Sequence, residues 1–307
     1  MAKRSRRRWQ DFQWRLEAVG YDVLAAIIRL APIDVASGFG GWLLKSLGPL
    51  TPTHRTALRN LRLAFPDWDE AERRRIARLQ WENVGRVFFE FFIMDRILAD
   101  PGRVEFPSQA EVEEILGDGR PLIFVSGHFA NFEIMASCGL QPGVEGVLVY
   151  RGLNNPYIDQ RMRETRLRYG VKLLAPKGAH GGRGVMAALS AGVPVGILAD
   201  QKYNEGPLVP LFGHLANTQH APVRWAMRFG ARLQPGWVER KQGARFRLYV
   251  GAPIELPSGG EAADVEEGVR RVNAFIEARA TARPWEYWWV HRRFPDKLYA
   301  ELKAQGY

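Results

Sequence analysis

The sequence predicts an α/β fold with a mixed, mostly parallel central sheet flanked by helices. Short apolar runs alternate with helical patterns from about residue 119 onward. One of these runs, residues 121–126, is apolar up to Ser126, ends at Gly127 and is followed by a helical pattern. This alternation is typical of chains in which a helix returns each strand to the same sheet.

Six segments are expected to form strands, with helical patterns between several of them. The strands are expected at residues 122–126, 146–150, 171–174, 193–199, 232–239 and 246–250. Helices are expected at residues 129–140, 155–169, 183–191 and 218–229, and a charged amphipathic helix at 262–282. Residues 209–213 are expected to be a loop.

The first 50 residues are expected to form a basic arm and amphipathic helices that associate with a membrane, and residues 51–307 the α/β domain. One lysine and four arginines precede a group of aromatic residues, as in segments that meet lipid headgroups. The basic residues are Lys3, Arg4, Arg6, Arg7 and Arg8, and the aromatic ones are Trp9, Phe12, Trp14 and Tyr21. The longest uncharged run covers residues 35–44, short of the roughly 20 that a spanning helix needs. Two helices split near Pro32 would lie on the membrane. Alternatively, they cover the sheet of a soluble domain.

Two further helices are expected ahead of the sheet, at residues 53–65 and 69–98. Asp67 or Asp69 would cap the second one. Residues 87–94 are apolar almost all round, which indicates a buried helix or the lining of an acyl-chain channel.

The composition narrows the classes of partner. The chain has an ordinary apolar fraction of 46% but a formal net charge of +10. Such a charge favours an anionic partner: a nucleic acid, an anionic membrane or an acidic carrier protein. Base-stacking motifs are absent, so nucleic acid is not expected. The only cysteine, Cys138, excludes an internal disulfide framework, and no paired-cysteine or His-Glu-x-x-His metal motif occurs.

The segment from His128 to Glu133 is the main candidate for chemistry. Residues five apart on a helix point about 140° away from each other. The two side chains can therefore meet only if His128 lies in the turn ahead of the helix and Glu133 in its first turns, and Gly127 favours such a turn. His128 could equally be a buried, hydrogen-bonded histidine. A second pair with this spacing, His291 and Asp296, is interrupted by Pro295 and is interpreted as a coincidence.

Other polar residues also follow predicted strands. Arg151 comes directly after residues 146–150, and Asp200 directly after residues 193–199. Because the carboxyl ends of parallel strands form one edge of a sheet, these residues and His128 are expected to converge there. Each residue alone could be an ordinary polar group at a strand end. Ser126 as an acyl-accepting nucleophile is disfavoured because the hydrolase elbow motif is absent.

With these stretches together, the chain resembles the lipid A biosynthesis acyltransferases, the late lauroyl and myristoyl enzymes of the His-x4-Asp/Glu superfamily. The resemblance covers about residues 121–294. It rests on Gly127-His128-Phe-Ala-Asn131-Phe-Glu133, Tyr150-Arg151 with Asn155-Pro156, Asp200-Gln201, the Val-Pro-Leu-Phe-Gly run at 209–213, and Pro284-Trp-Glu-Tyr-Trp-Trp-Val-His-Arg-Arg-Phe294.

The resemblance implies a glycerolipid acyltransferase-like fold and transfer of a fatty acyl group from acyl carrier protein, or a similar thioester, to a hydroxyl of a lipid A precursor. The reaction would take place at the cytoplasmic face of the inner membrane, without a metal or cofactor. Another glycolipid or a lysophospholipid remains an alternative acceptor, and a thioesterase that uses water an alternative activity.

The resemblance also assigns site residues. It implies that His128 and Glu133 are catalytic. The residues implied to bind substrate are Arg151, Asn131, Asp200, Gln201, Arg292 and Arg293, with Arg151 at acceptor phosphate or the reacting centre and Asp200 in support. Arg292 and Arg293 would face lipid phosphates or the acidic carrier. The alternative for these two arginines is a core helix ending in a solvated basic patch.

The expected chemistry is general-base catalysis. An aliphatic hydroxyl is a poor nucleophile at neutral pH and needs a base within hydrogen-bond reach. A neutral His128 would serve, oriented by Glu133, which would also stabilise the imidazolium. The tetrahedral oxyanion would need backbone N–H donors or a cation such as Arg151.

Overall fold

The computed structural model describes residues 2–117, 119–137, 146–150, 152–171, 173–176 and 179–307. Within these residues, seven strands form one sheet in the order β1-β9-β8-β2-β5-β3-β4. The strands are β1 (Val104–Glu105), β2 (Leu122–Ser126), β3 (Val147–Tyr150), β4 (Leu173–Pro176), β5 (Val195–Leu198), β8 (Arg232–Arg240) and β9 (Phe246–Val250). All neighbours pair in parallel except β8 and β9. The predicted mixed, mostly parallel sheet is confirmed.

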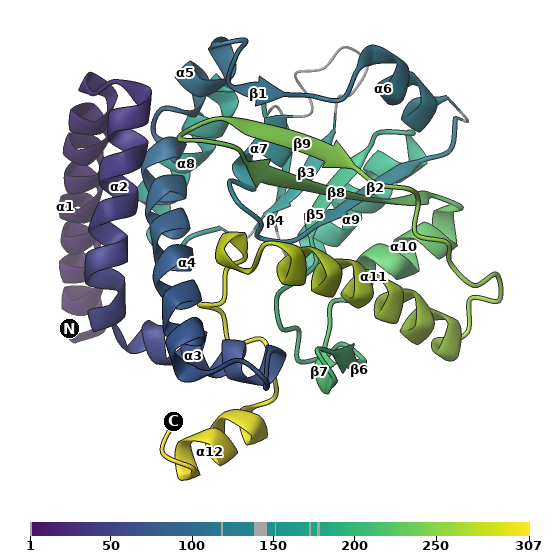
Figure 1. Cartoon of the computed structure of the whole chain (residues 1–307). Helices are drawn as coiled ribbons and strands as arrows, with labels where there is room; N and C mark the ends of the chain where they lie inside the picture. Colours follow the sequence, from purple (N-terminus) through teal and green to yellow (C-terminus); the bar gives the residue numbers. More distant parts are fainter. Residues whose placement is uncertain (1, 118, 138–145, 151, 172, 177–178) are drawn as a thin grey trace.

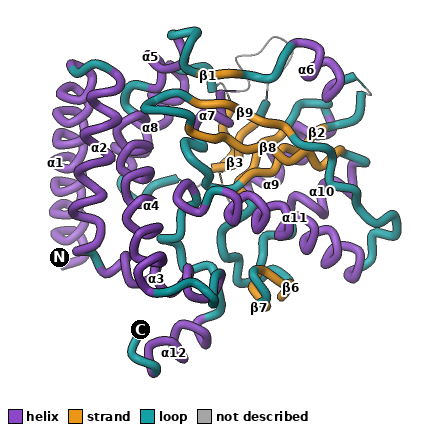
Figure 2. Tube along the Cα trace, in the orientation of Figure 1, coloured by secondary structure: helices purple, strands orange, loops and turns teal. Residues whose placement is uncertain are grey.

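Helices surround this sheet (Figures 1 and 2). They are α1 (Ala2–Leu30), α2 (Ile33–Leu47), α3 (Pro52–Ala64), α4 (Glu70–Phe91), α5 (Met94–Ala99), α6 (Gln109–Leu116), α7 (Glu133–Ala136), α8 (Pro156–Arg168), α9 (Ala179–Ser190), α10 (Ala221–Phe229), α11 (Ala262–Ala282) and α12 (Asp296–Ala304). Asp69 caps α4 by accepting the N–H of Glu72 at 2.7 Å, as the sequence predicts. Short 3-10 turns lie at Gly48–Leu50 and Pro284–Glu286.

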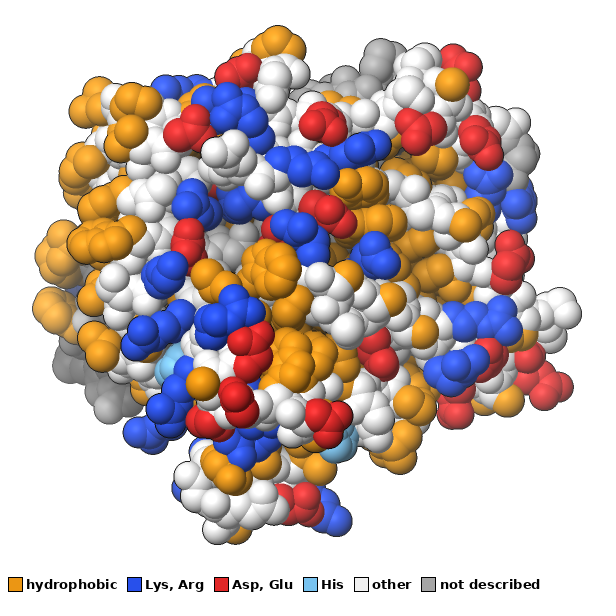
Figure 3. Space-filling model, viewed as in Figure 1, with side chains coloured by type: hydrophobic (Ala, Val, Ile, Leu, Met, Phe, Trp, Pro, Cys, Tyr) orange, Lys and Arg blue, Asp and Glu red, His pale blue; other side chains and the backbone are white. Residues whose placement is uncertain are grey.

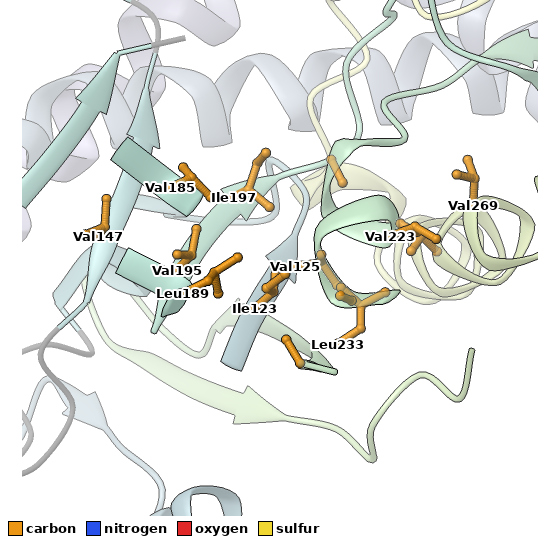
Figure 4. Close-up of a cluster of buried hydrophobic side chains, with 14 of the residues drawn as sticks. Ile123, Val125, Val147, Val185, Leu189, Val195, Ile197, Val223, Leu233 and Val269 are labelled. Carbon is orange, nitrogen blue, oxygen red and sulfur yellow. The ribbon is translucent and has the colours of Figure 1, made fainter. Parts of the chain in front are cut away.

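Alternating side chains of the strands enter two cores. Ile123 and Val125 of β2 face a core shared with α9, α10 and α11, shown in Figure 4. Phe246 and Leu248 of β9 face a second core, which receives Phe91 of α4. The period-two alternation of strand side chains produces this division. Apolar burial on both faces fixes the register of the central strands.

Of the two N-terminal helices, α2 packs along α4 and α1 packs against α8 (Figure 1). The split falls at Pro32, as expected, because proline cannot continue the hydrogen-bonding pattern of α1. The backbones of α2 and α4 come very close at Gly40 and Gly85, where a Cβ on Gly85 would collide with the carbonyl of Gly40. No helix among the described residues has the length and apolarity to cross a bilayer.

Three parts of the sequence prediction are wrong in detail. Residues 209–213 are not a loop throughout, because β6 (Leu208–Leu211) and β7 (His214–Asn217) form a separate hairpin. The expected helix at 129–140 begins only at Glu133, since the preceding residues form a turn. The late aromatic segment, residues 287–294, contains no helix: Tyr287 pairs with Phe129, and a turn and bends follow.

Candidate active site

A tight turn joins β2 to α7 and carries His128. Its left-handed residue is Ala130, with φ of 43°, and not the glycine that the sequence suggested. A non-glycine residue in this region is strained and persists only where its surroundings hold it. Here the N–H of Ala130 donates to Glu286 O at 2.9 Å, and the N–H of Trp288 donates to His128 O at 3.2 Å. The late aromatic segment therefore holds the turn from one side.

His128 and Asp200 form a buried pair. Asp200 Oδ1 lies 2.8 Å from His128 Nδ1, and Asp200 Oδ2 accepts the backbone N–H of His128 at 2.9 Å. Ser126 of β2 pairs in register with Leu198 of the neighbouring parallel strand β5. His128 lies two residues after Ser126, and Asp200 lies two residues after Leu198. The predicted convergence of His128 and Asp200 at one sheet edge is thus what the structure shows.

The environment keeps Asp200 ionised. Burial alone raises the pKa of its carboxyl, but the charge of His128 and the hydrogen bonds from its ring and backbone outweigh burial and lower the pKa to about 2. An ionised carboxylate can only accept, so in the neutral form of the imidazole the proton is on Nδ1. The free lone pair is then on Nε2, which makes no hydrogen bond to any described residue. A histidine in this state is equipped to accept a proton.

Aromatic rings enclose the imidazole. The ring centroid of His128 lies 4.7 Å from that of Phe132 and 5.5 Å from that of Trp288. His291 lies 5.2 Å away by the same measure, and burial, then the charge of His128, lowers its pKa. A small cavity borders Asp200 and is lined by Trp288 and His291, among others. These rings exclude water from one side of the base.

Glu133 does not contact His128, contrary to the expected orienting role. Its carboxylate accepts from Arg166 Nη2 at 2.6 Å and from Tyr169 Oη at 2.6 Å. Burial lowers the pKa of Arg166, but the charge of Glu133 and its hydrogen bond, together with Tyr169, outweigh burial and raise the pKa. Burial and the same carboxylate raise the pKa of Tyr169. The Glu133 carboxylate at the start of α7 binds Arg166 of α8, whereas the contact to the imidazole is made by Asp200.

The other predicted substrate-binding residues are dispersed. Asn131 is fully buried and donates to Glu90 Oε2 at 2.8 Å. Gln201 is partly exposed beside Asp200. Arg151 lies outside the described residues.

Arg292 and Arg293 point in different directions. Arg292 is exposed and pairs with Asp296 at 3.0 Å. Arg293 is only 5% exposed and donates to Asn217 O at 2.9 Å and Thr218 Oγ1 at 2.7 Å. The alternative of a solvated basic patch is therefore wrong for Arg293, because its guanidinium is buried and donates to protein oxygens instead of to water. The core helix of that alternative is also wrong, because residues 287–294 form a bridge, a turn and bends.

Sequence reasoning missed three residues near the site. Arg166 is one of several arginines in a predicted helix, and nothing in the sequence distinguishes it. His291 was set aside because its spacing to Asp296 is coincidental, yet it lies beside His128. Glu90 carried a signal: a single carboxylate inside the apolar run at residues 87–94 needs a buried partner.

The chain matches the family described as bacterial lipid A biosynthesis acyltransferase over residues 11–296. It is 31% identical to the lipid A biosynthesis lauroyltransferase of Escherichia coli K12 over 290 residues, which cover 91% of each chain. It is 27% identical to a lipid A biosynthesis acyltransferase of Haemophilus influenzae, over 86% of this chain and 84% of the relative. It is 24% identical to the lipid A biosynthesis palmitoleoyltransferase of E. coli K12, over 80% of this chain and 79% of the relative. The chain therefore belongs to the bacterial lipid A biosynthesis acyltransferase family and is an O-acyltransferase.

Proposed function

We propose that this enzyme transfers a fatty acyl group from an acyl carrier protein thioester to a hydroxyl of a lipid A precursor, at the cytoplasmic face of the inner membrane. The names of its relatives support the acceptor class. The observation that carries the chemistry is the buried hydrogen bond between His128 Nδ1 and Asp200, which leaves Nε2 open.

In the first step, Nε2 of His128 takes the proton of the acceptor hydroxyl as its oxygen attacks the thioester carbonyl. A C–O bond forms, the carbonyl π electrons move to oxygen, and a tetrahedral oxyanion results. Asp200 offsets the positive charge that appears on the imidazolium. Arg151 is our candidate for the oxyanion's counter-charge.

In the second step, the oxyanion collapses and the C–S bond breaks. The carrier thiolate leaves with the bonding electron pair and receives the proton from His128. The products are the acylated lipid and the free thiol, and His128 is neutral again. Direct transfer of this kind forms no acyl-enzyme.

For Glu133 we propose a supporting part in catalysis. Its carboxylate holds Arg166 and Tyr169 against the start of α7, directly after the turn that carries His128. A buried charge pair at this place fixes where the turn ends. Glu133 would thus influence transfer through the backbone instead of through the imidazole.

We further propose that α1 and α2 rest on a lipid surface. Side chains spaced three or four apart form one exposed apolar stripe on α1: Trp9, Phe12, Leu16, Val19, Val23, Ile27 and Leu30. Val35, Phe39 and Trp42 of α2 are also exposed, and this edge of the molecule is largely apolar in Figure 3. A continuous exposed apolar surface of this length is unusual for a protein surrounded by water.

Two acidic residues of α1 bind the region of α8, and neither belongs to the exposed apolar stripe. Asp22 pairs with Arg161 of α8 at 2.6 Å, and Glu17 accepts from Asn155 at 2.8 Å. An amphipathic helix on a soluble domain normally buries its apolar face and exposes its charges. Here α1 buries apolar residues such as Ile28 and also exposes an apolar stripe, which suits an apolar environment outside the protein.

The test is acyl transfer by the purified full chain in mixed micelles. Carrier protein thioesters of several chain lengths are incubated with a Kdo-bearing lipid A precursor, a lysophospholipid or no lipid, and the products are identified by mass spectrometry. We expect one acyl group to be added to the lipid A precursor. Transfer to the lysophospholipid alone, or thioester cleavage that needs no lipid, contradicts the proposal.

His128→Ala provides the catalytic control. Loss of the base should lower the rate by roughly three orders of magnitude or more while the fold is retained. A variant that melts like the wild type and still transfers at a near-normal rate excludes His128 as the base.

A further inference from the structure

We infer that Glu90 of α4 is a positioning residue for the transfer reaction, because it fixes the turn that carries His128 through Asn131. Glu90 is fully buried, and three side chains from different parts of the chain bind its carboxylate. Ser37 donates at 2.6 Å, Asn131 at 2.8 Å and Arg240 at 3.0 Å. The inference rests on the proposed function for its kinetic readout.

Asn131 connects Glu90 to the catalytic turn in both directions. Its amide N–H2 is bound by Glu90, and its Oδ1 accepts the backbone N–H of Glu133 at 3.2 Å. The residue before it is Ala130, which has the strained positive φ. A side chain that is bound at both ends fixes the direction of the chain between the strained residue and the start of α7.

A second residue of α4 contacts the same turn. Asn83 donates to Ala130 O at 3.2 Å and to Glu286 O at 3.3 Å, and its Oδ1 accepts from Arg240 at 3.3 Å. Asn83 and Glu90 are seven residues apart and so lie on one face of the helix, two turns from each other. This face of α4 therefore binds the turn at two points, and at Asn83 it also binds Glu286 O, which accepts the N–H of Ala130.

The pairing of charges determines which substitutions are informative. Arg240 binds both oxygens of Glu90, so removal of the carboxylate would leave a largely buried guanidinium without its counter-charge. Glu90→Asp keeps the charge but withdraws the carboxylate by one methylene, which weakens its reach to Asn131. Asn131→Ala removes the same contact from the other end.

The experiment measures kcat and both KM values for Glu90→Asp, Asn131→Ala and the double variant, in the full chain. We expect each single variant to lower kcat by about tenfold or more with both KM values within about twofold, and the double variant to be no slower than the slower single variant. Losses that multiply in the double variant contradict a shared contact. A raised acceptor KM with unchanged kcat in Asn131→Ala would mean that Asn131 binds substrate instead.

Two controls separate positioning from general stability. Ser37→Ala removes another hydrogen bond to the same carboxylate without touching the turn, and should leave kcat within about twofold of the wild type. Asp95→Asn breaks a partly buried ion pair with Arg29, away from the turn. It shows how much kcat falls when the protein is only destabilised. If Asp95→Asn lowers both melting temperature and kcat as much as Glu90→Asp does, the role is merely structural.

Hydrogen exchange supplies a readout that does not depend on the reaction. Backbone amides of residues 128–134 should exchange faster in Glu90→Asp than in the wild type, but not in Ser37→Ala. Unchanged exchange in Glu90→Asp overturns the inference. If the wild type transfers no acyl group at all, the proposed function fails, and the exchange data still decide whether Glu90 holds the turn.

Discussion

Asp200 binds His128 twice, through the ring and through the backbone. One carboxylate oxygen meets Nδ1 at 2.8 Å, and the other accepts the N–H of the same residue at 2.9 Å. Rotation of the His128 side chain about its Cα–Cβ bond would break the ring contact to Asp200, although the backbone contact would remain. The direction of the Nε2 lone pair is set by a residue 72 positions away in the sequence.

Asp200→Asn should lower kcat by about a hundredfold or more with little change in either KM. The wild-type carboxylate accepts from two N–H donors, whereas a carboxamide has one acceptor oxygen and one N–H2 group. One of the two donors of His128 would face another donor, so either the tautomer or the turn is lost. Initial rates, with the melting temperature as the control for folding, measure this. Transfer within a few-fold of the wild type would exclude Asp200 as the orienting residue.

Glu133→Gln should behave differently from Asp200→Asn. It leaves the buried Arg166 without its counter-charge, which typically costs about 3–5 kcal/mol of stability. We expect a lower melting temperature and a partial loss of kcat, smaller than the loss in Asp200→Asn. If Glu133→Gln instead folds like the wild type and is the slower of the two variants, then Glu133 acts on the imidazole in the catalytic complex, as the sequence spacing first suggested.

The strands could be predicted from the sequence, but the partners of the site residues could not. All six predicted strands are confirmed, most within one or two residues of the expected bounds, because apolar runs bounded by glycine, proline and polar residues are a local signal. The meeting of His128 with Asp200 was also predictable, since parallel strands end at one edge. Their hydrogen bond could not be predicted, because it requires that β2 and β5 are neighbours in the sheet. In the sequence, β3 and β4 lie between these two strands. Likewise, only the packing of α8 shows that Arg166 is the partner of Glu133.

Stability should fall as pH falls below about 6.5, partly because of His291. Burial, then the charge of His128, lowers the pKa of His291 from its ordinary value of 6.5. Below pH 6.5, His291 binds a proton in the unfolded chain but not yet in the folded chain. Its contribution to folding stability is therefore complete above pH 6.5 and is lost as the pH falls toward the folded-state pKa. His54 and His220 shift in the same direction. Melting temperatures between pH 7.5 and 5.5 should fall less steeply in His291→Gln. Equal slopes in both proteins contradict this.

Gly85→Ala should destabilise the protein by about 1–3 kcal/mol, because overpacking at a close helix contact forces the backbones apart. A Cβ at this position collides with the carbonyl of Gly40 and lies 2.9 Å from the Cβ of Leu44. Gly20→Ala is the matched control: it is also helical, but its Cβ would meet no atom within 4 Å. That change should be neutral or stabilising, since glycine is a poor helix former. Thermal melting of the two variants distinguishes a packing requirement from a simple preference for glycine.

The exposed stripe on α1 should be needed for binding to lipid. Leu16 and Ile27 are 63% and 60% exposed and lie on this stripe, and burial of each side chain in a bilayer contributes about 1.5–3 kcal/mol. Leu16→Glu with Ile27→Glu should therefore lower the partition coefficient for vesicles that contain anionic phospholipid by roughly tenfold or more. Leu215→Glu is a matched control, because Leu215 is 57% exposed but belongs to β7, away from α1 (Figure 1). Flotation of the full chain with such vesicles measures both. If the double variant floats like the wild type while Leu215→Glu does not, the lipid-binding surface is at the hairpin and the proposed orientation on the membrane is wrong.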